Sequence, residues 1–138
     1  MEGLIILYGL FVKHAIADLA KVQLIMELVV ERDESYDHGQ GLLYLGVLNS
    51  LIPPSLGGKP DVARGYFDRA IKVTEGKNLY IKVMYAQQYA RMMFDQELHD
   101  ELLQSVIESN PEVENLWLQN VYAQKQAAVL LAESVEYF

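Results

Sequence analysis

Apolar residues recur along the chain at spacings of three and four, the period of an α-helix that packs on one side. No segment shows the sustained alternation of apolar and polar residues that marks a half-buried strand. The pattern predicts helices over residues 4–16, 19–31, 40–51, 61–74, 78–94, 96–109 and 113–137. Short polar or Gly/Pro-containing stretches such as "EGKN" and "SNPE" separate several of them. The sequence therefore predicts an all-α fold of about seven helices.

Small and bulky residues follow a fixed order in three of these helices. The order is that of the second helix of tetratricopeptide repeats, Ala-x3-Phe-x2-Ala, in which small residues let two helices approach and the large one fills the groove beside them. Three sets of residues meet the frame: Ala63, Phe67 and Ala70; His99, Leu103 and Val106; and Val22, Met26 and Val29. The spacing indicates antiparallel hairpins stacked as a right-handed α-solenoid, with an irregular helical bundle as the alternative.

The stretch "IPPSLGGKPD" at residues 52–61 is the least helix-compatible part of the chain. Pro53 and Pro54 end the preceding helix, and Gly57 and Gly58 allow positive φ for a reversal. The interval it occupies is longer than the matching interval of a tetratricopeptide repeat, so we expect an insertion in a turn. A phosphate-binding P-loop would need a preceding strand and a Ser or Thr after the lysine, and neither is present.

Length and charge narrow the class of protein. The 138 residues, 51% of them hydrophobic, suffice for one domain, which we expect to span residues 1–138. A formal net charge of −8 and 11 scattered Lys and Arg residues oppose binding to nucleic acid or to an anionic membrane surface. The chain has no Cys, which excludes disulfides and thiolate chemistry.

Catalytic and metal-binding patterns are missing from the sequence. The three histidines, His14, His38 and His99, fall on different segments, and neither H-E-x-x-H nor G-x-S-x-G occurs. Asp95 and His99 lie one helical turn apart and are expected to form a surface pair. We therefore predict no catalytic residues, no metal site and no cofactor, and nothing in the sequence argues for an enzyme.

Polar and aromatic residues on otherwise apolar helices are the remaining candidates for function. Taken singly, each tyrosine could pack in the core with its hydroxyl reaching water. Taken together, they resemble the lining of a solenoid groove that binds a peptide or small ligand. The candidate groove residues are Tyr44, Asn49, Tyr85, Gln88, Tyr89, Arg91, Asn120 and Gln124, with Pro53, Pro54, Gly57 and Gly58 as a rim loop. Arg91 is expected to pair with a ligand carboxylate.

Several ordered blocks of the sequence resemble one protein family. The blocks are "YLGVLNSLIPPSLGGKPDVARGYFDRAI", "GKNLYIKVMYAQQYAR", "FDQELHDELLQSVIESNPE" and "LWLQNVYAQKQAAVLLAESVEYF". Together they are similar to the tetratricopeptide-like T component of TRAP transporters. The resemblance implies a periplasmic, lipid-anchored helical protein that oligomerises, engages the solute-binding protein of a TRAP system and helps in the uptake of small organic ligands, acidic or hydrophobic.

The start of the chain departs from this family. "MEGLIILYGLF" aligns with a helix from the middle of the family's proteins, and it lacks the Trp residues usual there. We therefore expect the chain to be the C-terminal part of a longer protein whose lipoprotein segment lies outside it. A self-assembling helical-repeat module without a ligand of its own is the alternative function.

Overall fold

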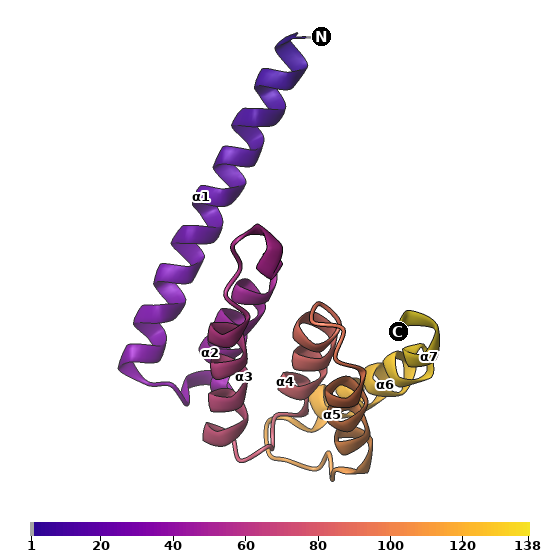
Figure 1. Ribbon diagram of the computed structural model, residues 1–138. Coiled ribbons are helices and arrows are strands. Elements are labelled where there is room, and N and C mark those ends of the chain that lie inside the picture. The colour runs from indigo at the N-terminus through magenta and orange to yellow at the C-terminus, as the bar shows by residue number, and fades with distance from the viewer. Residues whose placement is uncertain (1) are drawn as a thin grey trace.

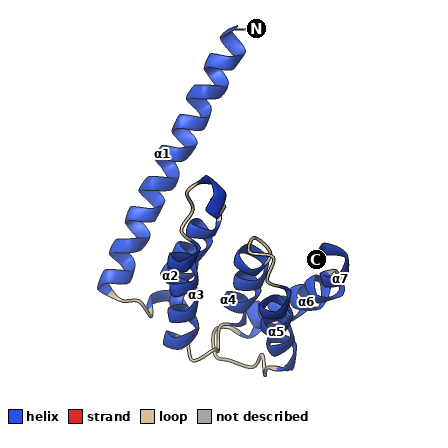
Figure 2. Ribbon diagram, viewed as in Figure 1, coloured by secondary structure: helices blue, strands red, loops and turns tan. Residues whose placement is uncertain are grey.

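The computed structural model describes residues 2–138, except for the side chains of residues 2–5, 7–9, 11–13, 15 and 16. Within this range the fold is all-α, as predicted, and contains no strand (Figure 2). A 3-10 turn η1 (Pro54–Leu56) and a π-helix η2 (Tyr85–Ala90) complete it. The seven α-helices are α1 (Glu2–Arg32), α2 (Tyr36–Ser50), α3 (Pro60–Val73), α4 (Leu79–Met84), α5 (Gln96–Glu108), α6 (Trp117–Ala132) and α7 (Ser134–Tyr137).

The largest differences from the predicted helix boundaries are in three places; in addition, α2 begins at Tyr36 and not at residue 40. The predicted helices 4–16 and 19–31 form the single helix α1, because Ala17 and Asp18 between them contain no helix breaker. The predicted helix 78–94 is divided into α4 and η2. The predicted helix 113–137 begins only at Trp117 and is divided at Glu133 into α6 and α7. Apolar periodicity continues across these junctions, so it could not reveal them.

Neighbouring helices pack as antiparallel pairs, α2 with α3 and α4–η2 with α5, followed by α6 and α7 (Figure 1). The C-terminal half of helix α1 packs on α2, and the N-terminal end of α1 points away from the body. Within the first pair, a Cβ on Gly46 would lie 3.0 Å from three atoms of the Phe67 ring. This close approach is the one that the repeat spacing predicted.

Two clusters of buried residues make up the core. One joins α2, α3, α4 and η2 around Phe67 and Tyr85, and the other joins α4, η2, α5 and α6 around Leu103 and Ala127. The first two predicted sets are fully buried as expected: Ala63, Phe67 and Ala70, and His99, Leu103 and Val106. The third set is only partly buried, with Val22 40% exposed on α1.

The loop at 52–61 is a turn between α2 and α3, as predicted. Pro53 accepts hydrogen bonds from the N–H groups of Leu56 and Gly58, at 3.0 Å each. Gly57 has the expected positive φ of 91°. Gly58 does not have positive φ, and glycine is required there for a different reason: a Cβ would collide with the Ile52 carbonyl oxygen.

The π-helix η2 is a local widening of the helix that begins as α4. The N–H of Arg91 bonds to the carbonyl of Ala86 at 3.1 Å, and that of Asp95 bonds to Ala90 at 2.9 Å, both with the five-residue separation of a π-turn. The widened turn directs Tyr85 and Tyr89 into the core.

Candidate functional site

The helices α2, α4 and α6 each begin a repeat, and we call them the first helices. One tyrosine from each of them lies on a shared side of the molecule. Tyr44 on α2 and Tyr122 on α6 are 44% and 57% exposed, and Tyr80 on α4 is partly buried between them. Burial is the main cause that raises the pKa of Tyr80, and the negative charges that Tyr122 and Tyr44 would carry raise it further, so both phenols are near enough to act on it electrostatically. We call these three residues the tyrosine row.

A hollow of about 280 Å³ lies beside this row, between η2 and α6. Its lining is Gln87, Tyr122, Lys125, Gln126, Val129 and Leu130. Among the described residues, nothing donates a hydrogen bond to Oε1 of Gln126, although that atom is shielded from solvent. Because an unpaired buried polar atom costs free energy, a bound group that donates to this amide would relieve the cost. The hollow thus offers apolar walls and one cation, and its lining residue Gln126 carries an acceptor that no described residue satisfies.

Two of the predicted groove residues lie in the core instead of on this surface. Tyr85 is 2% exposed and stacks on Phe67, with ring centroids 4.8 Å apart and planes 7° apart. Its hydroxyl donates to Asp68 Oδ1 at 3.0 Å. Burial raises the pKa of Tyr85 strongly, and the Asp68 charge and hydrogen bond raise it further. Tyr89 is 4% exposed and meets the Tyr85 ring edge-on.

Asn120 and Gln124, also predicted for the groove, hold connecting loops. Asn120 is fully buried; its Oδ1 accepts from the Leu79 N–H at 3.0 Å, and its Nδ2 donates to the Lys77 carbonyl at 2.9 Å. Gln124 donates to the carbonyl of Ser109 at 2.8 Å and so satisfies the end of α5. Their amides are engaged within the chain.

Asn78 makes the equivalent link one repeat earlier, and the sequence analysis missed it. Its Nδ2 donates to the His38 carbonyl at 3.0 Å, as Asn120 donates to Lys77. Asn120 thus ties α6 to the loop before α4, and Asn78 ties the start of α4 to the non-helical start of α2, where His38 has positive φ. The signal was the pattern Asn-x-Tyr, which occurs at Asn78–Tyr80 and again at Asn120–Tyr122. The same pattern would have revealed two members of the tyrosine row.

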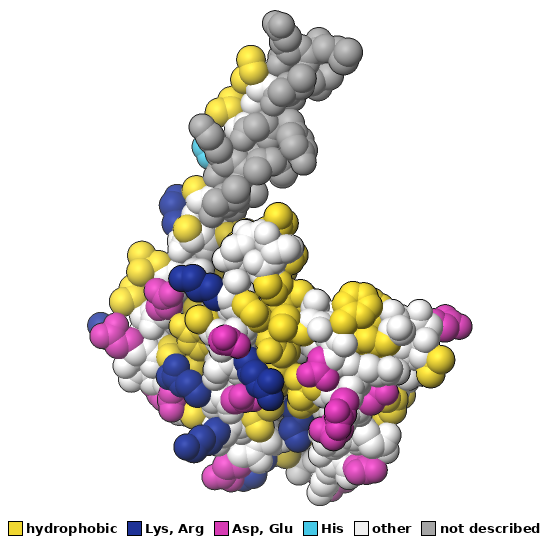
Figure 3. Space-filling model, in the orientation of Figure 1, with side chains coloured by type: hydrophobic (Ala, Val, Ile, Leu, Met, Phe, Trp, Pro, Cys, Tyr) yellow, Lys and Arg dark blue, Asp and Glu magenta, His cyan; other side chains and the backbone are white. Residues whose placement is uncertain are grey.

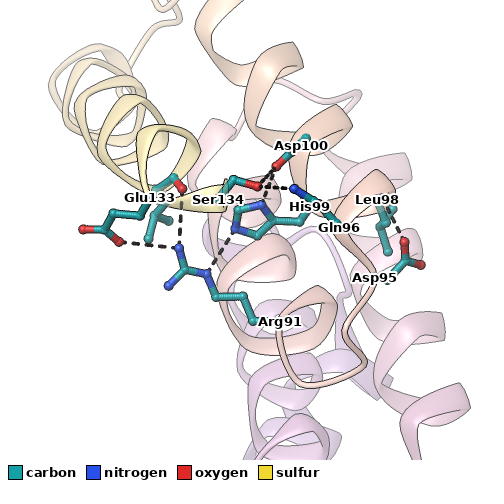
Figure 4. A network of polar contacts seen from close by, with 9 residues as sticks. Arg91, Asp95, Gln96, Leu98, His99, Asp100, Glu133 and Ser134 are labelled. Carbon is teal, nitrogen blue, oxygen red and sulfur yellow. Dashed lines mark hydrogen bonds and ion pairs between the residues drawn. The ribbon is translucent and has the colours of Figure 1, made fainter. Parts of the chain in front are cut away.

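Arg91 is at the centre of a polar network that joins η2, α5 and α7 (Figure 4). Its side chain is 14% exposed, its Nη2 lies 3.6 Å from Glu133 Oε2, and its Nε donates to His99 Nε2 at 3.1 Å. The Tyr137 ring covers the guanidinium, with its centroid 4.5 Å from Cζ. The cation predicted to bind a ligand carboxylate therefore already has a carboxylate partner.

His99 is fully buried, so the expected surface pair with Asp95 is wrong. Asp95 instead caps α5 by accepting from the Leu98 N–H at 3.0 Å. The ring of His99 lies between Arg91 and Asp100, with Nδ1 2.8 Å from Asp100 Oδ1. The repeat frame, in which position 99 is a core position, was the better guide.

Ser134, His99 and Asp100 meet in space but do not have the geometry of a catalytic triad. The Ser134 hydroxyl donates to Asp100 Oδ1 at 2.6 Å, and His99 Nε2 accepts from Arg91. In a triad the histidine would accept the serine proton and the carboxylate would orient the histidine. Here no base is directed at the hydroxyl, so the cluster cannot activate a nucleophile.

The remaining predicted residues lie at other places. Asn49 bonds to the Leu45 carbonyl of its own helix at 2.7 Å. Asn49 lines a hollow of about 210 Å³ together with Gly57, Gly58 and Gln23, which lies on α1. Pro53 and Pro54 are exposed in the turn, and Gln88 is partly buried in η2. The predicted set is thus divided among the core, one hollow beside the turn, the tyrosine row and the Arg91 network.

The described part of residues 2–138 supports neither a metal site nor a membrane-spanning helix. No cluster of three acidic or histidine side chains there could hold a metal ion. None of these helices combines the length and the apolar character that crossing a membrane requires. On the face shown in Figure 3, Lys and Arg side chains are interspersed with Asp and Glu.

A family model described as TRAP transporter T-component matches residues 5–138, which is nearly the whole chain. No curated protein sequence matches the chain.

Proposed function

Because the chain belongs to the TRAP transporter T-component family, we propose that it is a non-enzymatic periplasmic protein that engages the solute-binding protein of a TRAP transporter. Its task is to help in the uptake of small organic ligands, acidic or hydrophobic. The observation that carries this proposal is the tyrosine row, an exposed aromatic surface built from three successive first helices beside a ligand-sized hollow. Tyrosines in such positions supply large contact areas at low conformational cost.

The hollow beside the row is our proposed place for the ligand. Val129 and Leu130 would cover its apolar part, and Lys125 would attract an acidic group. We assign this role to Lys125 and not to Arg91, because Arg91 is paired with Glu133 and covered by Tyr137. A ligand at Arg91 would first have to displace both groups.

Native mass spectrometry and pull-down with the solute-binding protein test the proposal. Wild type should form the complex, and the double variant Tyr44→Ala/Tyr122→Ala should bind at least about tenfold more weakly, because aromatic contacts dominate such surfaces. Tyr36→Ala is the matched control, since Tyr36 is 64% exposed and outside the row. Absence of any complex would overturn the proposed partner, and equal binding by the double variant would overturn the proposed surface.

A second function, self-assembly without a ligand, is favoured by one observation. Four exposed apolar side chains share one side of α1: Ile6, Leu10, Leu24 and Leu28. Helix faces of this kind usually become covered by another helix. In that case removal of the tyrosine row would change nothing, whereas removal of this α1 face would abolish assembly.

A further inference from the structure

The last five residues, 134–138, are held to the body through three side chains. We call them the C-terminal segment. The Ser134 hydroxyl donates to Asp100 at 2.6 Å. The Tyr137 ring lies over the Arg91 guanidinium, and the Phe138 ring meets the His99 ring edge-on at 5.1 Å. These three contacts converge on Arg91, His99 and Asp100, whose side chains Figure 4 shows.

The geometry fixes the tautomer of His99. Arg91 can only donate, so the His99 Nε2 that it approaches at 3.1 Å must be unprotonated and accept. The ring proton is therefore on Nδ1, which donates to Asp100 Oδ1 at 2.8 Å. Asp100 accepts from Ser134 through the same oxygen. The order of donors thus runs from Arg91 through neutral His99 to Asp100.

A second proton on His99 is incompatible with this order. Nε2–H would face the Nε–H of Arg91 at 3.1 Å, which sets two donors and two positive charges against each other in a buried place. The other charged groups around the ring are Asp100, on its Nδ1 side, and Glu133, which contacts Arg91 from the far side. Asp95 contacts His99 only through its backbone carbonyl, which accepts a hydrogen bond from the His99 N–H.

Relief of this conflict requires Arg91 or the ring to move, and the C-terminal segment rests on both. Tyr137 would lose its position over the guanidinium and Phe138 its contact with the imidazole. We propose that protonation of His99 releases residues 134–138, so that the C-terminal segment is a latch that opens in acid. The latch depends only on contacts within the chain and would operate whether or not the chain binds a TRAP component.

Asp100 does not act as the trigger. Burial opposes its charge, but hydrogen bonds from Ser134 and His99 outweigh this and lower the pKa of Asp100. The carboxylate therefore stays charged through the range in which imidazoles titrate.

Hydrogen exchange measured by NMR at about pH 7.5 and pH 5 tests the latch. The reporters are the amides of Glu136, Tyr137 and Phe138, which bond to carbonyls of residues 133 and 134. After correction for the intrinsic pH dependence of exchange, their protection in wild type should fall by about tenfold or more at the lower pH. In His99→Gln, whose amide can accept from Arg91 but cannot titrate in this range, protection should be the same at both values.

His14→Gln is the control, since His14 is exposed on α1 and should leave the acid transition unchanged. Unchanged protection in wild type, or an equal loss in His99→Gln, would overturn the proposal. If His99→Gln does not fold, the ring nitrogens of wild-type His99 decide the matter. We expect the Nδ1–H tautomer at about pH 7.5 and a ring titration that coincides with the loss of protection; the other tautomer, or a separate titration, would refute the latch.

Discussion

At the scale of residues, the contact of Gly46 with Phe67 decides how closely α2 and α3 approach. A methyl group on Gly46 would press on three ring atoms at 3.0 Å, and the ring cannot retreat because Tyr85 stacks on its other face. We expect Gly46→Ala to lower the free energy of unfolding in urea by about 1–3 kcal/mol. In a Phe67→Leu background the same change should cost less, because the smaller side chain leaves room.

Gly65 provides the matched control for that cycle. It lies in the middle of α3, and a Cβ there would meet nothing within 4 Å. Gly65→Ala should therefore stabilise the protein by about 0.5–1 kcal/mol, the usual gain of Ala over Gly within a helix. Equal effects of the two glycine substitutions would contradict the close-packing argument.

Tyr85 gives the protein a stability that alkali removes. Burial, followed by the charge and hydrogen bond of Asp68, raises the pKa of the folded phenol. The unfolded phenol ionises near pH ~10. Its contribution is therefore fully present below that value and declines as pH rises above it, because only the unfolded chain releases the proton. Urea unfolding of Tyr85→Phe should depend less on pH than wild type between about pH 9 and 11; parallel curves would show that Tyr85 ionises equally in both states.

At the scale of elements, buried asparagines connect one hairpin to the next. Asn120 links α6 to the N-terminus of α4 and to the Lys77 carbonyl. Asn120→Ala leaves these groups unpaired and should cost roughly 2–4 kcal/mol in urea unfolding. Gln126→Met on the same helix should cost nothing or stabilise, because Gln126 Oε1 has no partner among the described residues. A similar loss in both variants would contradict the assignment of the Asn120 effect to its hydrogen bonds.

These links also show where sequence reasoning stops. The spacing of Ala63, Phe67 and Ala70 predicted a buried helix face, because burial follows the helical period. Asn120 has no such period: a polar residue at a helix start is equally compatible with a ligand groove and with a hydrogen bond to a distant loop. Its partner Lys77 is 43 residues away, and only the stacked repeat brings the two together.

At the scale of the whole molecule, the all-α class and the antiparallel pairing of helices followed from the sequence, whereas the site did not. Arg91 was predicted to face a ligand, but its neighbours come from α5 and α7, and their approach depends on the turn at Glu133 that periodicity did not reveal. Tyr80 and Tyr122 were missed because each is unremarkable alone. Only the stacking of α4 and α6 brings the two tyrosines into one surface.

The surface of α1 leads to a prediction about assembly. Its side chains Val29 and Val30 pack at Gly41 of α2, and the exposed residues Leu24 and Leu28 lie on the opposite side of the helix. If this face is buried between copies, sedimentation velocity should show self-association of wild type that Leu24→Gln/Leu28→Gln abolishes. The change leaves the net charge at −8, so altered repulsion cannot explain the result.

Leu118→Gln is the control for this experiment, since Leu118 on α6 is 85% exposed and far from α1 in the sequence. It removes more exposed apolar area per residue than either α1 substitution, so a general loss of surface hydrophobicity would act on it first. Association that survives the α1 change but disappears with Leu118→Gln would place the contact on α6. Because Leu118 and Tyr122 are one helical turn apart, copies of the chain would then compete with the solute-binding protein for the tyrosine row.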